Sequence, residues 1–109
     1  MAKTITLTFE GREYILEFTR STIAEMERRG FRASDITEKP MLTLPALFSG
    51  AFLAHHRNVK ANVIDAIFKK IPDKQNFLYA LGDMYNEPLE SLMDEPEEDE
   101  GNATWSQSW

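Results

Sequence analysis

The sequence predicts a mainly helical α+β fold, in which an N-terminal β-hairpin packs on a bundle of about four short helices and a disordered acidic tail follows. Three observations predict it: apolar residues alternate over residues 5–18, apolar stripes recur every three or four residues over 20–93, and carboxylates crowd residues 94–100. A chain of 109 residues has room for one core. We therefore expect a single domain over residues 1–93 and a flexible tail over 94–109.

The hairpin is predicted by two runs in which apolar residues alternate with threonine or glutamate. A two-residue loop at Gly11 and Arg12 brings the apolar residues of both runs onto one face, because side chains alternate with a period of two. Glycine at the first loop position suits a type II′ turn. A lone hairpin is marginal in water, so its apolar face must rest on the helices. The expected pairs are Phe9 with Tyr14, Leu7 with Leu16, and Ile5 with Phe18.

The first helix is predicted between a threonine cap and a glycine. Thr22 and Glu25 stand at capping-box spacing, with Thr19 as a rival cap. Gly30 suits the first position after the helix, where Phe31 would contact Met26.

The second helix is expected from Thr43, with Pro45 in its first turn. Gly50 costs about 1 kcal/mol relative to alanine inside a helix, so we expect a close neighbouring backbone there. A wide apolar stripe runs along this helix. It comprises Leu44, Leu47, Phe48, Ala51, Phe52 and His55.

Two further helices complete the bundle. The third is expected from about Lys60 and ends before Pro72. Asp73 can cap the fourth, which we expect over residues 74–93. Its inward-facing residues include Phe77, Leu81 and Tyr85.

The charge distribution separates the body from the tail. Six of the 18 acidic residues lie in residues 94–100, so residues 1–93 balance 12 acids with 12 bases and the tail carries the net charge of −6. A neutral body without a basic stripe suits a phosphate backbone poorly, so we expect no nucleic-acid partner. No run approaches the about 20 apolar residues of a spanning helix, and the N-terminus lacks a signal-peptide pattern. We expect a cytoplasmic protein without membrane contact.

No motif predicts catalysis, a cofactor or a metal. His55 and His56 are adjacent, whereas two metal ligands on a helix need a spacing of four. Cysteine, the G-x-S-x-G elbow and glycine-rich phosphate loops are absent from the sequence. We therefore expect a protein that is not an enzyme, with no catalytic, cofactor-binding or metal-binding residues.

Trp105 and Trp109 predict a binding role for the tail. A spacing of four places them on one face of either a helix or a strand. Tryptophan buries a large area with few rotatable bonds and is enriched at binding hot spots. Partner binding, docking on the chain's own body, and no role at all remain open. The acidic run between residues 94 and 100 is either a solubility tail or a mimic of nucleic acid.

Four stretches together resemble the tail assembly chaperones of long-tailed bacteriophages and prophages of Gram-positive hosts. They are ITLTFEGREYILEFTRSTI, LTLPALFSGAFLAHH, LYALGDMYNEPLESLMDE and GNATWSQSW. The resemblance implies a chaperone of the host cytoplasm, absent from the mature virion, that binds the tape-measure protein and keeps it soluble. It also implies self-association, and a longer frameshifted form that recruits the tail tube protein.

A chaperone of this kind needs an apolar groove for amphipathic helices. The runner-up is a small acidic regulator that imitates DNA and occupies a basic surface of a host protein. That alternative predicts that neutralising residues 97–100 abolishes activity, whereas changes to the apolar surface do little. The candidate partner-binding residues are Leu44, Phe48, Phe52, Phe77, Tyr85, Trp105 and Trp109. For each of the five helix residues, packing in the core is the alternative role.

Overall fold

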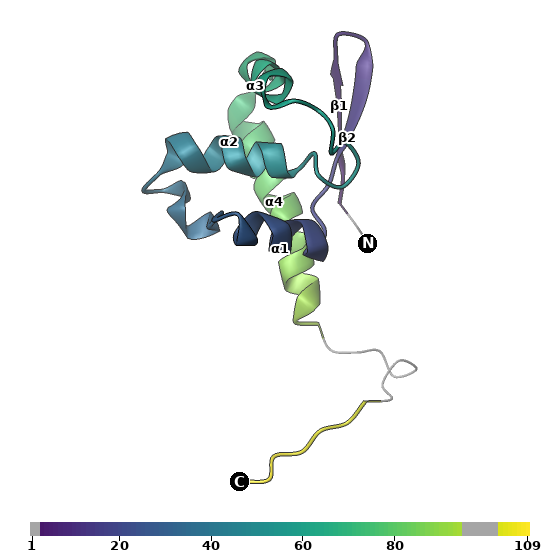
Figure 1. Cartoon of the computed structure of the whole chain (residues 1–109), viewed down its shortest axis with the longest axis vertical. Helices are drawn as coiled ribbons and strands as arrows, with labels where there is room; N and C mark the ends of the chain where they lie inside the picture. The colour runs from purple at the N-terminus through teal and green to yellow at the C-terminus, as the bar shows by residue number, and fades with distance from the viewer. Residues whose placement is uncertain (1–2, 95–102) are drawn as a thin grey trace.

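The computed structural model describes residues 3–94 and 103–109. A two-stranded antiparallel hairpin precedes the helices, which confirms the predicted mainly helical α+β fold (Figure 1). The disorder predicted for the acidic run falls on residues that, apart from Asp94, lie outside the described ranges. The elements are β1 (Ile5–Phe9), β2 (Arg12–Leu16), α1 (Arg20–Arg28), the 3₁₀ helix η1 (Ala33–Ile36), α2 (Pro40–Gly50), α3 (Ala61–Lys70) and α4 (Lys74–Leu92).

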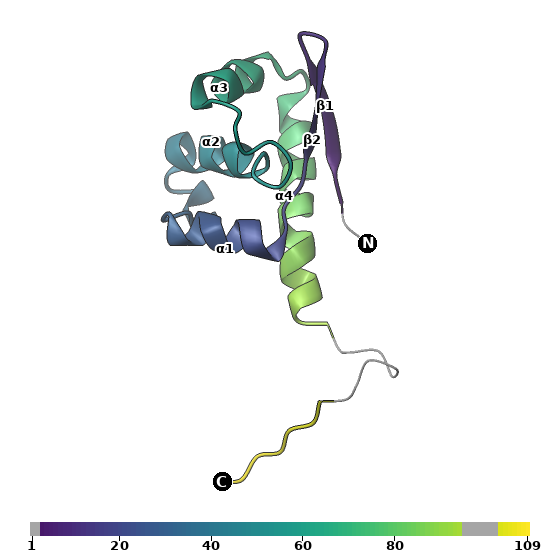
Figure 2. The same ribbon diagram turned by 45° about the vertical axis from the view of Figure 1, so that its right-hand side comes forward.

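Helix α4 is the scaffold on which the other elements are arranged. It runs along the height of the folded body, with α1, α2 and α3 stacked one above another on one side of it (Figures 1 and 2). The hairpin runs along another side of α4 (Figure 2). The 19 residues of α4 span about 28 Å, enough to contact all three stacked helices.

The hairpin turns one residue earlier than expected. Glu10 and Gly11 form the loop with φ of 51° and 75°, which fits a type I′ turn, so the predicted type II′ turn at Gly11 and Arg12 is wrong. The ladder pairs Leu7 with Tyr14 instead of Leu16. Because this register differs from the expected one by two residues, the same side chains still face the core. Phe18, which leaves the ladder, is buried.

Both ends of α1 are fixed by local hydrogen bonds. The Thr22 N–H donates to Thr19 Oγ1 at 3.1 Å and the Thr19 N–H donates to Thr22 Oγ1 at 2.9 Å, so Thr19 is the cap and Thr22 its capping-box partner. Gly30 has a φ of 98°, and the Phe31 N–H donates to the Met26 carbonyl at 3.0 Å. This Schellman turn confirms the predicted place of Gly30.

Two other helix starts differ from the prediction. Helix α2 begins at Pro40, three residues before the expected Thr43, because proline has a suitable φ and no N–H to leave unpaired in a first turn. Pro45 consequently lies inside the helix. Asp73 precedes α4 in a left-handed conformation, and its carboxylate accepts from the Asn76 side chain at 2.9 Å. Its side chain makes no capping bond to the backbone, so the predicted cap is wrong.

The core is centred on aromatic side chains of α2 and the turn after it. The Phe48 ring lies 5.1 Å from Phe52, 5.0 Å from Phe68 and 5.7 Å from Phe77, centroid to centroid. These contacts join α2 to α3 and α4. The largest fully buried side chains come from the hairpin and from the α2, α3 and α4 regions: Leu16, Phe48, Phe52, Ile67, Leu81 and Met84.

Gly50 makes room for a side chain of α1. A Cβ at position 50 would collide with Sδ and Cε of Met26 and lie 3.1 Å from its Cγ, so the neighbour is not the backbone that we expected. Met26 is itself buried. The missing Cβ therefore allows α1 and α2 to approach closely.

Alanine substitutions at two glycines should have opposite effects on stability. Gly82 lies inside α4, where an added Cβ meets nothing within 4 Å. Gly82→Ala should raise the free energy of unfolding by up to about 1 kcal/mol, because alanine is the better helix former. Gly50→Ala should lower it by about 1–2 kcal/mol, because displacing Met26 outweighs that gain. Urea denaturation measures both; equal stabilisation by the two substitutions would contradict the close packing of Met26 on Gly50.

Candidate binding groove

The predicted partner-binding residues fall into three groups. Phe48 and Phe52 are each 1% exposed and Tyr85 is also buried, so the prediction that they line an open surface is wrong. Phe48 packs against Phe68 of α3 and Phe77 of α4, and Phe52 packs against Tyr14 of the hairpin. Tyr85, on α4, packs against the rings of Phe18 and Phe31. Leu44 and Phe77 are half-buried. Trp105 and Trp109 are 85% and 94% exposed.

Large exposed apolar side chains lie elsewhere on the body. Met41 and Leu42, in the first turn of α2, are 87% and 74% exposed. A second patch, the α4 end, lies at the C-terminal end of α4. It comprises Leu89, Leu92 and Met93.

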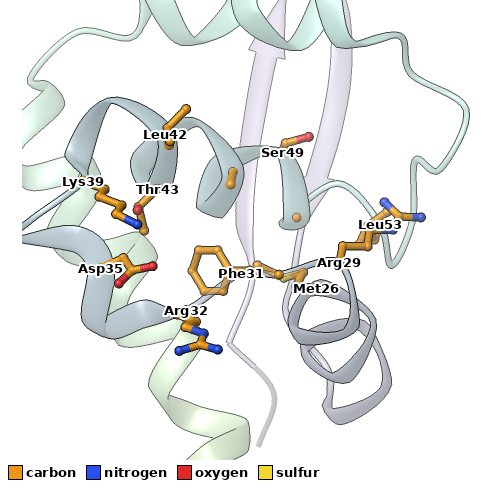
Figure 3. Close-up of a pocket in the computed structure, with 13 residues that line it drawn as sticks. Met26, Arg29, Phe31, Arg32, Asp35, Lys39, Leu42, Thr43, Ser49 and Leu53 are labelled. Carbon is orange, nitrogen blue, oxygen red and sulfur yellow. The ribbon is translucent and has the colours of Figure 1, made fainter.

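A groove of about 410 Å³ lies between the C-terminal end of α1, η1 and α2 (Figure 3). Figure 3 shows the Phe31 ring near its centre, with Asp35 of η1 and the preceding Arg32 on one side and helix α2 on another. Its apolar lining comes from all sides and comprises Met26, Phe31, Leu42, Ala46 and Leu53. The sequence builds this concavity locally, since the turn at Gly30 reverses the chain and Gly50 lets α1 approach α2.

One face of α2 follows the groove along its whole length. With 11 residues, α2 is about 16 Å long, or three turns. This face differs from the stripe that enters the core, so α2 carries apolar residues on both sides. A helix that is apolar all round is normally buried. The groove-lining positions recur at three- and four-residue spacing: Lys39, Leu42, Thr43, Ala46, Ser49, Gly50 and Leu53.

The rim of the groove is positively charged. Arg29, Arg32 and Lys39 line it, with Asp35 as the single carboxylate. Arg29 pairs with Glu25 at 2.5 Å, and Glu25 also pairs with Arg57. The hydrogen bond from Arg57, followed by the nearby positive charges, holds the pKa of Glu25 below its ordinary value. In the described part of the chain, Arg32 and Lys39 make no ion pair, so their charges face solvent.

The groove suits a ligand that has bulky apolar side chains for the floor and carboxylates for the basic rim. Its volume lies within the range of about 300–1,000 Å³ typical of ligand pockets, and its length matches an amphipathic helix of about three turns. Sequence reasoning missed Leu42 because it lies off the main stripe of α2. The available signal was the pair of apolar residues directly after Pro40, placed where first turns are usually polar.

A different contact ties His56 to the hairpin. The Ile15 N–H donates to His56 Nε2 at 2.9 Å, and the Tyr14 ring lies 5.2 Å from the imidazole in an edge-on geometry. Burial lowers the pKa of His56 below its ordinary value of 6.5, and the positive charges of His55 and Arg12 lower it further. The accepting nitrogen requires the neutral imidazole.

The domain should lose stability in mild acid through His56. Because the folded pKa lies below 6.5, the unfolded chain binds more protons just below that pH. The contribution of His56 to the free energy of unfolding is therefore complete above pH 6.5, and it is lost as the pH falls from there through the pKa of His56 in the folded chain. Urea denaturation across this window should show a decline in the free energy of unfolding that His56→Gln reduces. An identical pH profile for His56→Gln would contradict the role of the imidazole.

The described residues contain no group of three or more His, Cys, Asp or Glu side chains placed to bind a metal ion. Within residues 3–94 and 103–109, no helix combines the length and the apolar character needed to cross a membrane.

Comparison with known proteins gives one match. Residues 1–109 match the model of a family described as a domain of unknown function, DUF5055. No curated protein and no solved structure matches the chain. Because the match covers all 109 residues, the chain belongs to the DUF5055 family.

Proposed function

We propose that this member of the DUF5055 family is a phage tail assembly chaperone. It binds the tape-measure protein in the host cytoplasm, keeps it soluble, and is absent from the mature virion. A longer frameshifted form helps to recruit the tail tube protein. The role is one of binding and has no catalytic step.

The observation that carries the proposal is the uncovered apolar face of α2. Leu42 is 74% exposed at the edge of a groove whose floor is apolar, and Met41 next to it is exposed as well. Burying apolar surface is worth about 25 cal/mol per Å², so a face of this kind favours an apolar occupant. A tape-measure protein is a long, mostly helical chain with much apolar surface, and each exposed stripe offers anchors at positions i, i+3, i+4 and i+7.

Two further features bear on the proposal. The α4 end, with Leu92 and Met93 exposed, offers a second apolar surface for the self-association that we also propose. The alternative role as a DNA mimic gains no support from the groove, because Arg29, Arg32 and Lys39 make its rim basic. A DNA mimic instead needs a surface of carboxylates.

Co-expression tests the proposal. The chain is produced together with the product of the long open reading frame encoded just downstream, the expected position of the tape-measure gene. The long product should be soluble when the chain is present and insoluble when an unrelated small protein replaces it. Equal solubility in both cultures would overturn the proposal. Co-purification of the two proteins provides the second readout.

A further inference from the structure

The tail of this chain carries apolar side chains that nothing covers in the structure. Residues 103–109 form neither helix nor strand, and Trp105 and Trp109 are 85% and 94% exposed. Each buried tryptophan removes about 150–250 Å² from water. Two such side chains in one short segment favour a docked state wherever an apolar surface lies within reach.

The groove between α1 and α2 matches this segment in chemistry. Its floor is apolar, and its rim carries Arg29, Arg32 and Lys39 against the single carboxylate of Asp35. The sequence that leads to the tryptophans has six carboxylates and no cation over residues 94–100. Opposite charges of this kind steer a segment to its site and fix its orientation. The α4 end has Arg20 and Arg32 near it but also adjoins the exposed acid Asp94, whereas three cations line the groove against one carboxylate.

The groove lies within reach of the segment on the same chain. Arg20 Nη2, at the start of α1, donates to the Ser91 carbonyl at 3.1 Å, so the end of α4 lies beside the first turn of α1. The nine residues of α1 cover about 14 Å, which separates this point from the groove at the other end of α1. Residues 91–105 span roughly 25 Å even at half of full extension.

We propose that residues 103–109 dock on the groove of their own chain, with the tryptophans against the apolar floor beside Leu42. A tether this short gives the segment an effective concentration in the millimolar range. The segment covers the apolar groove when no other ligand is bound, and an incoming amphipathic helix displaces it. The docking itself does not depend on the proposed function.

Intrinsic fluorescence tests this docking directly. Trp105 and Trp109 are the chain's two tryptophans, so tryptophan emission reports on the segment alone. In the full chain at low salt, emission should lie at shorter wavelength than in an isolated peptide of residues 94–109. Acrylamide quenching should be lower than in the peptide by about twofold or more, because docking excludes the quencher. Salt at about 1 M should weaken this protection by screening the charges.

Variants locate the docking site. Leu42→Asp, and separately the pair Arg32→Glu and Lys39→Glu, should raise quenching to that of the peptide. Lys70→Glu, which reverses an exposed cation on α3 away from the groove, should leave the protection unchanged. Far-ultraviolet circular dichroism checks that each variant is folded. The two groove variants act by different means, so loss of folding in one leaves the other as the test.

Three outcomes would overturn the proposal. Quenching in the full chain that equals quenching in the peptide would show that the segment does not dock. Equal protection in the groove variants and in Lys70→Glu would place any docking elsewhere. Protection that falls on dilution of the protein would show docking between two copies. The tape-measure protein, the proposed client of this chain, is absent from the fluorescence assay. Failure of the docking proposal therefore leaves the proposed function to be decided separately by co-expression.

Discussion

Replacement of Phe48 by alanine should lower the free energy of unfolding by about 3–5 kcal/mol. Phe48 is 1% exposed and contacts three aromatic rings, on Phe52, Phe68 and Phe77. The substitution removes a buried ring and leaves a cavity where α2 meets α3 and α4. The free energy of unfolding of a small domain is about 5–15 kcal/mol in total, so the variant should be largely or partly unfolded at physiological temperature.

Urea denaturation and thermal melting measure this loss. Tyr79→Ala is the matched control, because it removes an aromatic ring from the exposed surface of α4 and should change stability by no more than about 0.5 kcal/mol. A Phe48→Ala variant of normal stability that no longer binds its client would contradict the structure. That result would place Phe48 on a partner-binding surface, one of the two roles that the sequence left open.

Leu42→Asp should abolish client binding while the domain stays folded. Leu42 is 74% exposed beside the groove, so its removal leaves no cavity. An aspartate there must lose its hydration when an apolar helix binds, and hot-spot losses of 2 kcal/mol or more weaken binding by at least about 30-fold. The position lies in the first turn of α2, where a negative charge stabilises a helix.

Pull-down of the co-expressed product of the downstream reading frame measures the effect, with melting temperature as the check on folding. Leu92→Asp places the same charge on the α4 end, whose leucine is also exposed, and should leave client binding intact. Loss of binding with Leu92→Asp and normal binding with Leu42→Asp would move the client site to the α4 end.

The sequence predicted the order of the two strands and four α-helices, but not the 3₁₀ helix η1, because strands and α-helices depend on local periodicity and end signals. The capping threonine, Gly30 and the prolines all act within one turn of their own positions. The hairpin register could not be predicted from alternation, because a shift of two residues leaves every side chain on the same face. The type I′ turn also required a positive φ at Glu10, which is uncommon for a residue other than glycine.

The candidate site was harder to predict than the fold. An apolar stripe predicts that one face of a helix will be covered. The same pattern arises whether the chain's own core or a partner covers that face. Phe48 and Phe52 belong to a stripe that the chain itself covers. Leu42 gave a weaker signal, and its groove exists only because the turn at Gly30 and the small Gly50 bring three elements together.

The central claim is that amphipathic helices bind in the groove between α1 and α2. A titration of the ¹⁵N-labelled chain with an amphipathic helical peptide from the proposed tape-measure partner, followed by amide chemical shifts, tests it most directly. The largest shifts should map to Phe31, Leu42, Ala46 and Leu53. Shifts confined to the α4 end would contradict it. The absence of any shift with the peptide in excess over the chain would contradict it as well.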